Sequence, residues 1–264
     1  MVHAMTVPNE SRLAHSRGAG AFVAGGTRRV ALLANGRRSG PITRLITPWD
    51  IGELTAPFVL LNYAEAARRS RPLFGIHPPS GITTLTVVLT GELSFEDVSG
   101  KRGEIAAGGL GWMKAGSVIW HEDGDAAREP LRVFHLWVEQ PLVAQEEFAA
   151  ASETIPADEV QEDGPVRVLL GELGRARSRI RHAPADLNVL HVRLKDRQDF
   201  RYAPPDGHNV SWLAVDRGSL QLAEGERVLW EQIAVFRNSS GVIAVEADGD
   251  TSFVLGSATR LPPP

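Results

Sequence analysis

The residues best suited to bind a metal are histidines and a carboxylate in the first half of the chain. His121 and Asp123 lie two positions apart in a predicted strand, so their side chains share one face and could present two ligands together. His77 ends the segment FGIHPP, just before a second predicted strand that would complete the ligand set. This spacing predicts a metal site, while histidines with purely structural hydrogen bonds are the plainer alternative.

Composition limits the chemistry that these residues could support. The 264 residues include no cysteine, which excludes disulfides, thiolate nucleophiles and sulfur ligands, so any metal must bind to histidine, aspartate, glutamate or water. The chain has 28 basic and 32 acidic residues and a net charge of −4, which argues against direct binding of nucleic acid. Only three of the basic residues are lysines, a skew that favours a bacterial source.

No segment carries the pattern of a targeting or membrane sequence. Residues 1–29 lack the apolar core of a secretory signal, and no run of 18 apolar residues occurs. We therefore expect a cytoplasmic protein without a membrane partner, whose glycine-rich residues 1–29 form a flexible arm. The sequence also lacks the GxGxxG, GxxxxGK[ST], HExxH and GxSxG motifs of nucleotide-binding and hydrolytic sites.

The elements that must position the histidines are short strands. Runs such as TLTVVL, SVIWH and LRVFHLWVE recur along the chain between Gly, Pro and Asp, which is typical of all-β sandwiches and barrels. In the last of these runs, Val133, His135 and Trp137 share one face. The pattern predicts two tandem β domains over residues 30–141 and 166–264. Residues 142–165 form a linker with a short helix in LVAQEEFAAA.

The two predicted domains also resemble each other. TVVLTGELSF (86–95) aligns without gaps to LAVDRGSLQL (213–222), which places Gly91 on Gly218 in a strand–turn–strand unit. The same offset carries the positions of His77 and His121 to Pro204 and Asp248, so the second domain has no equivalent histidine pair. We therefore expect any metal in the first domain only.

Residues 57–141 resemble the N-terminal cupin domain of the pirin family. FGIHPPSGITT, TVVLTGELSFEDVSG, GLGWMKAGSVIWHED and HLWVEQP follow the family patterns FxxHPHRGFET, TYVLxGxhxHxDSxG, GxhQWMTAGxGIxHxE and QLWVNLP in the same order. This resemblance implies a bicupin, two tandem double-stranded β-helix domains. It also implies a mononuclear metal bound by three His and one Glu, and activity like that of quercetin dioxygenases.

The resemblance assigns the metal ligands, with one position lost. His77, His121 and Asp123 fall on three of the four ligand positions, whereas Pro79 replaces the fourth and has no donor atom. The remaining two imidazoles and one carboxylate match an Fe(II) facial triad, so Fe(II) or another divalent transition metal is the implied cofactor. Asp is shorter than Glu by about 1.5 Å, so Glu122, brought back by a β-bulge, is a further candidate ligand.

Several neighbours complete the implied site. His135 replaces the Gln of QLWVNLP and is a substitute ligand if its face looks into the barrel, or else a packed, hydrogen-bonded residue. Glu122 and Lys114 are candidates for a proton relay. A pocket for a flat phenolic substrate such as a flavonoid would be lined by four residues, for which ordinary core packing is the alternative: Phe74, Trp112, Met113 and Trp120.

A regulatory protein is the rival to a dioxygenase. Pro79, Ser80 and Thr83 stand where the family has His, Arg and Glu, so one corner of the site has changed as a block. Such a loss suits a pirin-like protein without metal that binds another protein. The two hypotheses differ in whether His77 and His121 are needed for function.

Overall fold

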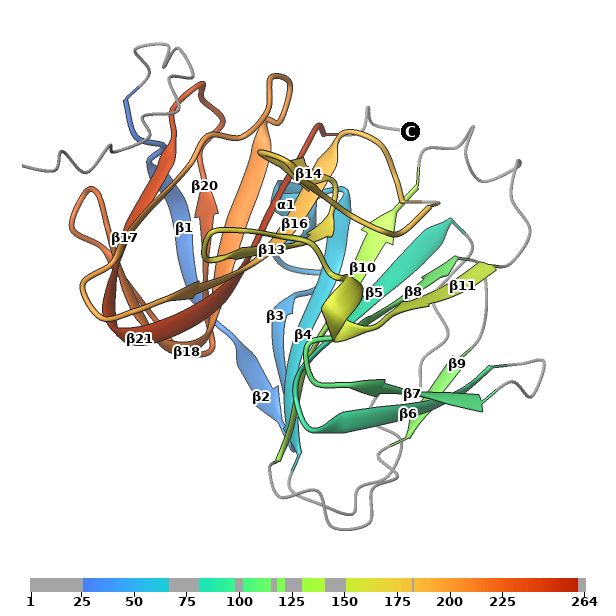
Figure 1. The fold of residues 1–264 in the computed structure, drawn as a ribbon. Helices are drawn as coiled ribbons and strands as arrows, with labels where there is room; N and C mark the ends of the chain where they lie inside the picture. Colours follow the sequence, from blue (N-terminus) through green and yellow to red (C-terminus); the bar gives the residue numbers. More distant parts are fainter. Residues whose placement is uncertain are drawn as a thin grey trace, which may run out of the picture.

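The computed structural model describes residues 26–66, 81–97, 102–114, 118–121, 130–140, 151–181 and 183–260. Almost every element in these ranges is a strand, which confirms the all-β prediction; the helical elements are the single turn α1 (Gly52–Thr55) and the 3-10 turn η1 (Ala157–Glu159). No helix among the described residues has the length and apolar character needed to span a bilayer. Figure 1 shows two β modules side by side.

The first module comprises β2–β11 and contains two sheets. A seven-stranded sheet has the order β11-β8-β5-β10-β4-β3-β2, and a three-stranded sheet has the order β7-β6-β9. The strands are β2 (Arg37–Ser39), β3 (Ile42–Ile46), β4 (Phe58–Ala66), β5 (Ile82–Thr90), β6 (Glu92–Asp97), β7 (Arg102–Ala106), β8 (Leu110–Lys114), β9 (Val118–His121), β10 (Leu131–Glu139) and β11 (Ala151–Ile155).

The second module comprises β1 and β12–β21. Its nine-stranded sheet follows β1-β20-β18-β21-β16-β13-β12, with β17 on β21 and β19 on β18, and β14 pairs with β15. The strands are β1 (Val30–Asn35), β12 (Glu162–Asp163), β13 (Val166–Leu170), β14 (Glu172–Leu173), β15 (Ala176–Arg177), β16 (Leu187–Leu194), β17 (Asp199–Tyr202), β18 (Val210–Leu222), β19 (Arg227–Leu229), β20 (Gln232–Phe236) and β21 (Ile243–Ala258).

Alternation along the strands divides the apolar residues among three cores. On β10, Val133 packs inside the first module, whereas Phe134 joins a core shared by the two modules. Phe58 of β4 meets Trp212 of β18 edge to face in that shared core, with ring centroids 5.4 Å apart. A third core fills the second module. The shared core explains why both faces of the central strands are buried.

Strand β1 joins the sheet of the second module although it precedes the first module in sequence. Val30 pairs with Phe236 and Asn35 with Gln232. Just before it, Thr27 forms a bridge with Val242, and the side chain of Arg28 is buried. The domain boundaries at residues 30–141 and 166–264 stay predictions. Strand β1 falls within the first of these ranges but pairs in the sheet of the second module.

The linker segment contributes a strand at its described end. Ala151, the last residue of LVAQEEFAAA, begins β11, which pairs with β8 of the first module. Residues 142–150, where the rest of the helix is predicted, lie outside the described ranges. The described part of the linker therefore contributes β11 to the first module's sheet and β12 to the second module's sheet.

Candidate functional site

Much of the predicted metal site lies outside the described residues. These predicted site residues are Phe74, His77, Pro79, Ser80, Glu122 and Asp123. For Lys114, Trp120 and His121 the structure gives the strand but not the surroundings of the side chain. Their assignment as metal ligands, proton relay or pocket residues therefore stays a prediction.

The backbone of β9 places His121 in the smaller sheet of the first module. The strand pairs antiparallel with β6, so that His121 lies opposite Ser94 and Trp120 opposite Phe95. Lys114 ends β8, opposite Thr83 of β5. These positions put the predicted site residues on both sheets of one module.

The interior of the first module changes from apolar to polar along its strands. Val88 and Val133 belong to its apolar core. Residues two and four positions away on the same strands face the same interior. On this basis the polar set is Asn62 of β4, Thr84 and Thr86 of β5, and His135 and Trp137 of β10, which alternation and the β10 pairings bring together.

His135 is held between two side chains of this set. The Trp137 indole N–H donates to His135 Nε2 at 2.9 Å, and His135 Nδ1 lies 2.9 Å from Thr86 Oγ1. Because indole can only donate, Nε2 must accept, so we assign the ring proton to Nδ1, which donates to Thr86. Complete burial lowers the pKa of His135 to about 3. The imidazole is therefore neutral at physiological pH.

This arrangement bears on the prediction that His135 is a substitute metal ligand. The face of β10 that carries His135 does point into the module, which is the condition for a ligand role. A metal ligand needs a free lone pair, however, and the lone pair on Nε2 already accepts the proton of Trp137. The geometry favours the alternative, a hydrogen-bonded histidine inside the barrel, and the ligand role stays a prediction without support among the described contacts.

Asn62 is a polar group of this interior without a hydrogen-bond partner among the described residues. Its register position on β4 is opposite His135. The side chain is buried, yet its Oδ1 atom has no hydrogen-bond partner. A buried acceptor without a donor costs about 1–3 kcal/mol. Alternation along β10 already indicated Trp137 beside His135, whereas no sequence signal singled out Asn62 or Thr86.

Thr83, which stands where the family motif has Glu, forms hydrogen bonds to two residues near the end of β10. Its hydroxyl donates to the Val138 carbonyl at 3.2 Å and accepts from Gln140 Nε2 at 3.0 Å. The Gln140 backbone N–H donates to the Gly81 carbonyl at 2.8 Å. Thr83 therefore ties the start of β5 to the end of β10.

The two predicted pocket residues with described side chains lie in different cores. Trp112 is fully buried in the core shared by the modules, and its indole N–H has no partner. Met113 packs inside the first module. Trp112 thus lies in ordinary apolar core, and Met113 lines the interior that holds His135. Their roles as pocket residues stay predictions.

The described residues contain no cluster of three or more His, Asp or Glu side chains suited to a metal. In the second module, Asp248 occupies the position equivalent to His121 and forms an ion pair with Arg227.

Comparison with known proteins gives a consistent family. The family model for pirin matches residues 42–138. A Pseudomonas aeruginosa protein named "Putative quercetin 2,3-dioxygenase" is 30% identical over 85% of this chain and 82% of its own length.

Solved structures support the same fold. A quercetin 2,3-dioxygenase from Acinetobacter baumannii superposes with a TM-score of 0.76 and 23% identity, covering 90% of this chain and 89% of that one. The Escherichia coli bacterial pirin YhhW in complex with nickel(II) gives a TM-score of 0.65 and 18% identity, covering 87% and 100%. These likenesses confirm the bicupin fold.

Proposed function

Given that the chain belongs to the pirin family, we propose that it is a metal-dependent dioxygenase acting on a flavonoid or another phenolic small molecule. The observation that carries the proposal is the polar interior of the first module, where Asn62 Oδ1 is buried without a partner beside the Thr86–His135–Trp137 chain. The names of the related proteins indicate the substrate class. The reaction of this chain is our inference.

The proposed ligands are His77, His121 and Asp123, with Fe(II) or another divalent transition metal. Imidazole and carboxylate donors suit such metals, and a set of three leaves open positions for substrate. The unpartnered Asn62 Oδ1 fits a site of this kind, because it leaves an acceptor in the interior for a hydroxyl donor. The metal would supply Lewis-acid and dioxygen chemistry at a phenolic oxygen.

The described residues would shape the interior around that chemistry. His135, held neutral by burial, adds no positive charge that would repel a cation nearby. Thr86 and Trp137 fix its ring through both nitrogens. Asn62 would accept a hydrogen bond from a substrate hydroxyl and so orient the phenol. Met113 contributes an apolar wall for an aromatic ring.

Metal content and oxygen uptake test the proposal together. We expect about one metal per chain after anaerobic Fe(II) loading, because the proposed ligands form a single site. The metal should be lost in His121→Ala and retained in His15→Ala, a matched control in the predicted arm. Oxygen uptake with quercetin and simpler phenols should follow metal content across the three proteins. Uptake that persists in His121→Ala would refute the mechanism.

A regulatory role is the second candidate, and Pro79 is the observation that favours it. Proline removes one donor of the family's ligand set, and Ser80 beside it replaces the family's Arg. On this hypothesis the unmodified protein would take up no metal after loading, and His77→Ala and His121→Ala would leave binding of a protein partner unchanged. Stoichiometric metal in the unmodified protein would argue against it.

A further inference from the structure

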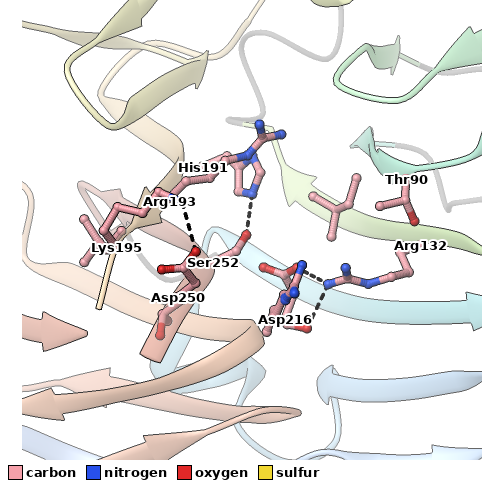
Figure 2. Close-up of a pocket in the computed structure, with 12 residues that line it drawn as sticks. Thr90, Arg132, His191, Arg193, Lys195, Asp216, Asp250 and Ser252 are labelled. Carbon is pink, nitrogen blue, oxygen red and sulfur yellow. Dashed lines mark hydrogen bonds and ion pairs between the residues drawn. The ribbon is translucent and has the colours of Figure 1, made fainter. Parts of the chain in front are cut away.

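A cavity of about 390 Å³ lies where the two modules meet. Figure 2 shows side chains from both modules converging on it, with the Arg132–Asp216 ion pair crossing from β10 to β18. The charged residues that line it are Arg132, Arg193, Lys195, Asp216, Arg217 and Asp250. Its volume is within the range of small-molecule sites, about 300–1,000 Å³.

Charge in this cavity is opposite to that of the whole chain. Four cationic and two anionic side chains line it, an excess of two positive charges in a protein of net charge −4. Arg132 pairs with Asp216, and Lys195 with Asp250 at 2.9 Å. Arg193 and Arg217 form no ion pair with any other described residue. Their charges act on Asp216 and Asp250 from beyond ion-pair distance. Both guanidinium groups therefore have donors available to bind an anion.

The buried wall of the cavity offers unpartnered polar atoms. His191 Nε2 lies 2.9 Å from Ser252 Oγ, whereas His191 Nδ1 and Asp216 Oδ1 are buried without a hydrogen-bond partner. Both residues are nearly inaccessible, at 2% and 3% exposure. Burial raises the pKa of Asp216, and the neighbouring Ser252 hydroxyl opposes that shift. A hydroxyl group on a ligand would add a donor for Asp216 Oδ1.

The wall is also held in place before any ligand binds. Arg132 Nε donates to the Tyr63 hydroxyl at 2.9 Å, and its Nη2 donates to the Asp216 carbonyl at 2.9 Å. These contacts join β4, β10 and β18 and fix Asp216 at the module boundary. A preorganised wall reduces the entropy lost on binding.

We propose that this cavity binds a small hydroxylated dianion between the two modules. The guanidinium groups of Arg193 and Arg217 bind its two negative charges, and its hydroxyl donates to Asp216 Oδ1. The apolar side chains of Leu89 and Leu194 would contact its short carbon skeleton. Hydroxydicarboxylates and sugar phosphates share this chemistry. The proposal does not depend on the metal site or on the dioxygenase activity.

Calorimetric titration of the full chain with malate, succinate and glycerol 3-phosphate tests the proposal. Malate should bind about tenfold more tightly than succinate, which lacks the hydroxyl but carries the same charges. Affinity should fall as salt rises. Tighter binding of glycerol 3-phosphate would assign the charge to a phosphate, and tighter binding of malate to carboxylates.

Two matched variants locate the binding. Arg193→Ala with Arg217→Ala should weaken malate binding at least tenfold, because both side chains are exposed and unpaired and their loss leaves the fold intact. Arg201→Ala, which removes an exposed arginine of β17 outside the cavity, should leave affinity unchanged. The proposal is overturned if none of the three probes binds at millimolar concentration, or if succinate equals malate. An equal effect of the Arg201→Ala control would overturn it as well.

Discussion

The polar interiors of the two modules differ in how far their hydrogen bonds are satisfied. In the second module, the Ser257 hydroxyl is 2.7 Å from the Tyr202 hydroxyl and 2.8 Å from His208 Nδ1, and Asn188 Nδ2 donates to Tyr202 at 3.0 Å. In the first module, Asn62 Oδ1 has no hydrogen-bond partner among the described residues, although it lies beside the hydrogen-bonded residues Thr86, His135 and Trp137. The network around Ser257 is thus satisfied, whereas the network around His135 leaves a polar atom for a ligand. The unpartnered atoms of His191 and Asp216 lie at the module boundary instead.

Arg28 adds further hydrogen bonds to the second interior. Its guanidinium donates to the His208 carbonyl at 2.8 Å, to Ser211 Oγ at 3.1 Å and to the Gly241 carbonyl at 3.1 Å. Burial lowers the pKa of Arg28, although its three acceptors keep the charge well solvated. The second interior is thus closed by a side chain from the segment before β1, and no described residue performs that role in the first module.

The largest expected effect is that of low pH on the free energy of unfolding, because each module contains a buried histidine with a lowered pKa. Burial lowers the pKa of His135 and of His191 to about 3, from 6.5 in the unfolded chain. Between these values the unfolded state binds more protons, so stability is full above pH 6.5 and is lost as pH falls. The expected slope is about 1.4 kcal/mol per pH unit for each histidine.

Denaturant unfolding between pH 7 and pH 4 measures this slope. His135→Gln and His191→Gln should each remove about half of it. Unchanged slopes in both variants would mean that these histidines are protonated in the folded protein and would contradict the neutral assignment.

A smaller effect is expected from removing the side chain that closes the second interior. Arg28→Leu leaves three buried acceptors without their donor, and we expect a loss of about 3 kcal/mol in the free energy of unfolding. Arg29→Leu is the matched control, because Arg29 is exposed and its pair with Glu224 should contribute less than about 1 kcal/mol. Urea unfolding measures both, and equal losses would show that Arg28 does not close the interior.

The finest comparison sets one asparagine against another. Asn188→Leu removes hydrogen bonds to Tyr202 and to the Glu172 backbone N–H, and it should cost about 2 kcal/mol. Asn62→Leu removes an acceptor without a partner, so it should cost less than about 0.5 kcal/mol and weaken phenol binding instead. Similar losses from the two substitutions would mean that the interiors are equally satisfied.

The sequence predicted those features that depend on local pattern. Strand alternation correctly placed His135 and Trp137 on one face of β10, and the aligned glycines of the repeat both have positive φ, 76° at Gly91 and 77° at Gly218. A Cβ atom at either position would lie closer to backbone than van der Waals contact allows, at 3.1 Å from Leu131 Cα and 2.8 Å from the Asp250 carbonyl oxygen. Turn chemistry of this kind is encoded within a few residues.

Features that depend on distant pairing could not be predicted in the same way. Nothing in VALLAN indicates that β1 pairs with β20, since strand propensity does not specify the partner. The buried role of Arg28 was equally hidden, because it follows from contacts some 180 residues away. The partners of His135 were foreseeable for Trp137 and not for Thr86, which lies on another strand.

The pairing of β1 with β20 also sets an order of events during synthesis. Val30 leaves the ribosome long before Phe236, its partner in the sheet, exists. Strand β1, the first among the described residues, therefore has no native partner strand while the first module is made. The second module cannot complete this edge of its sheet until β1 pairs with β20. Contacts so far apart in sequence slow folding. Strand β1 is thus made early and pairs late, after β20 has been synthesised.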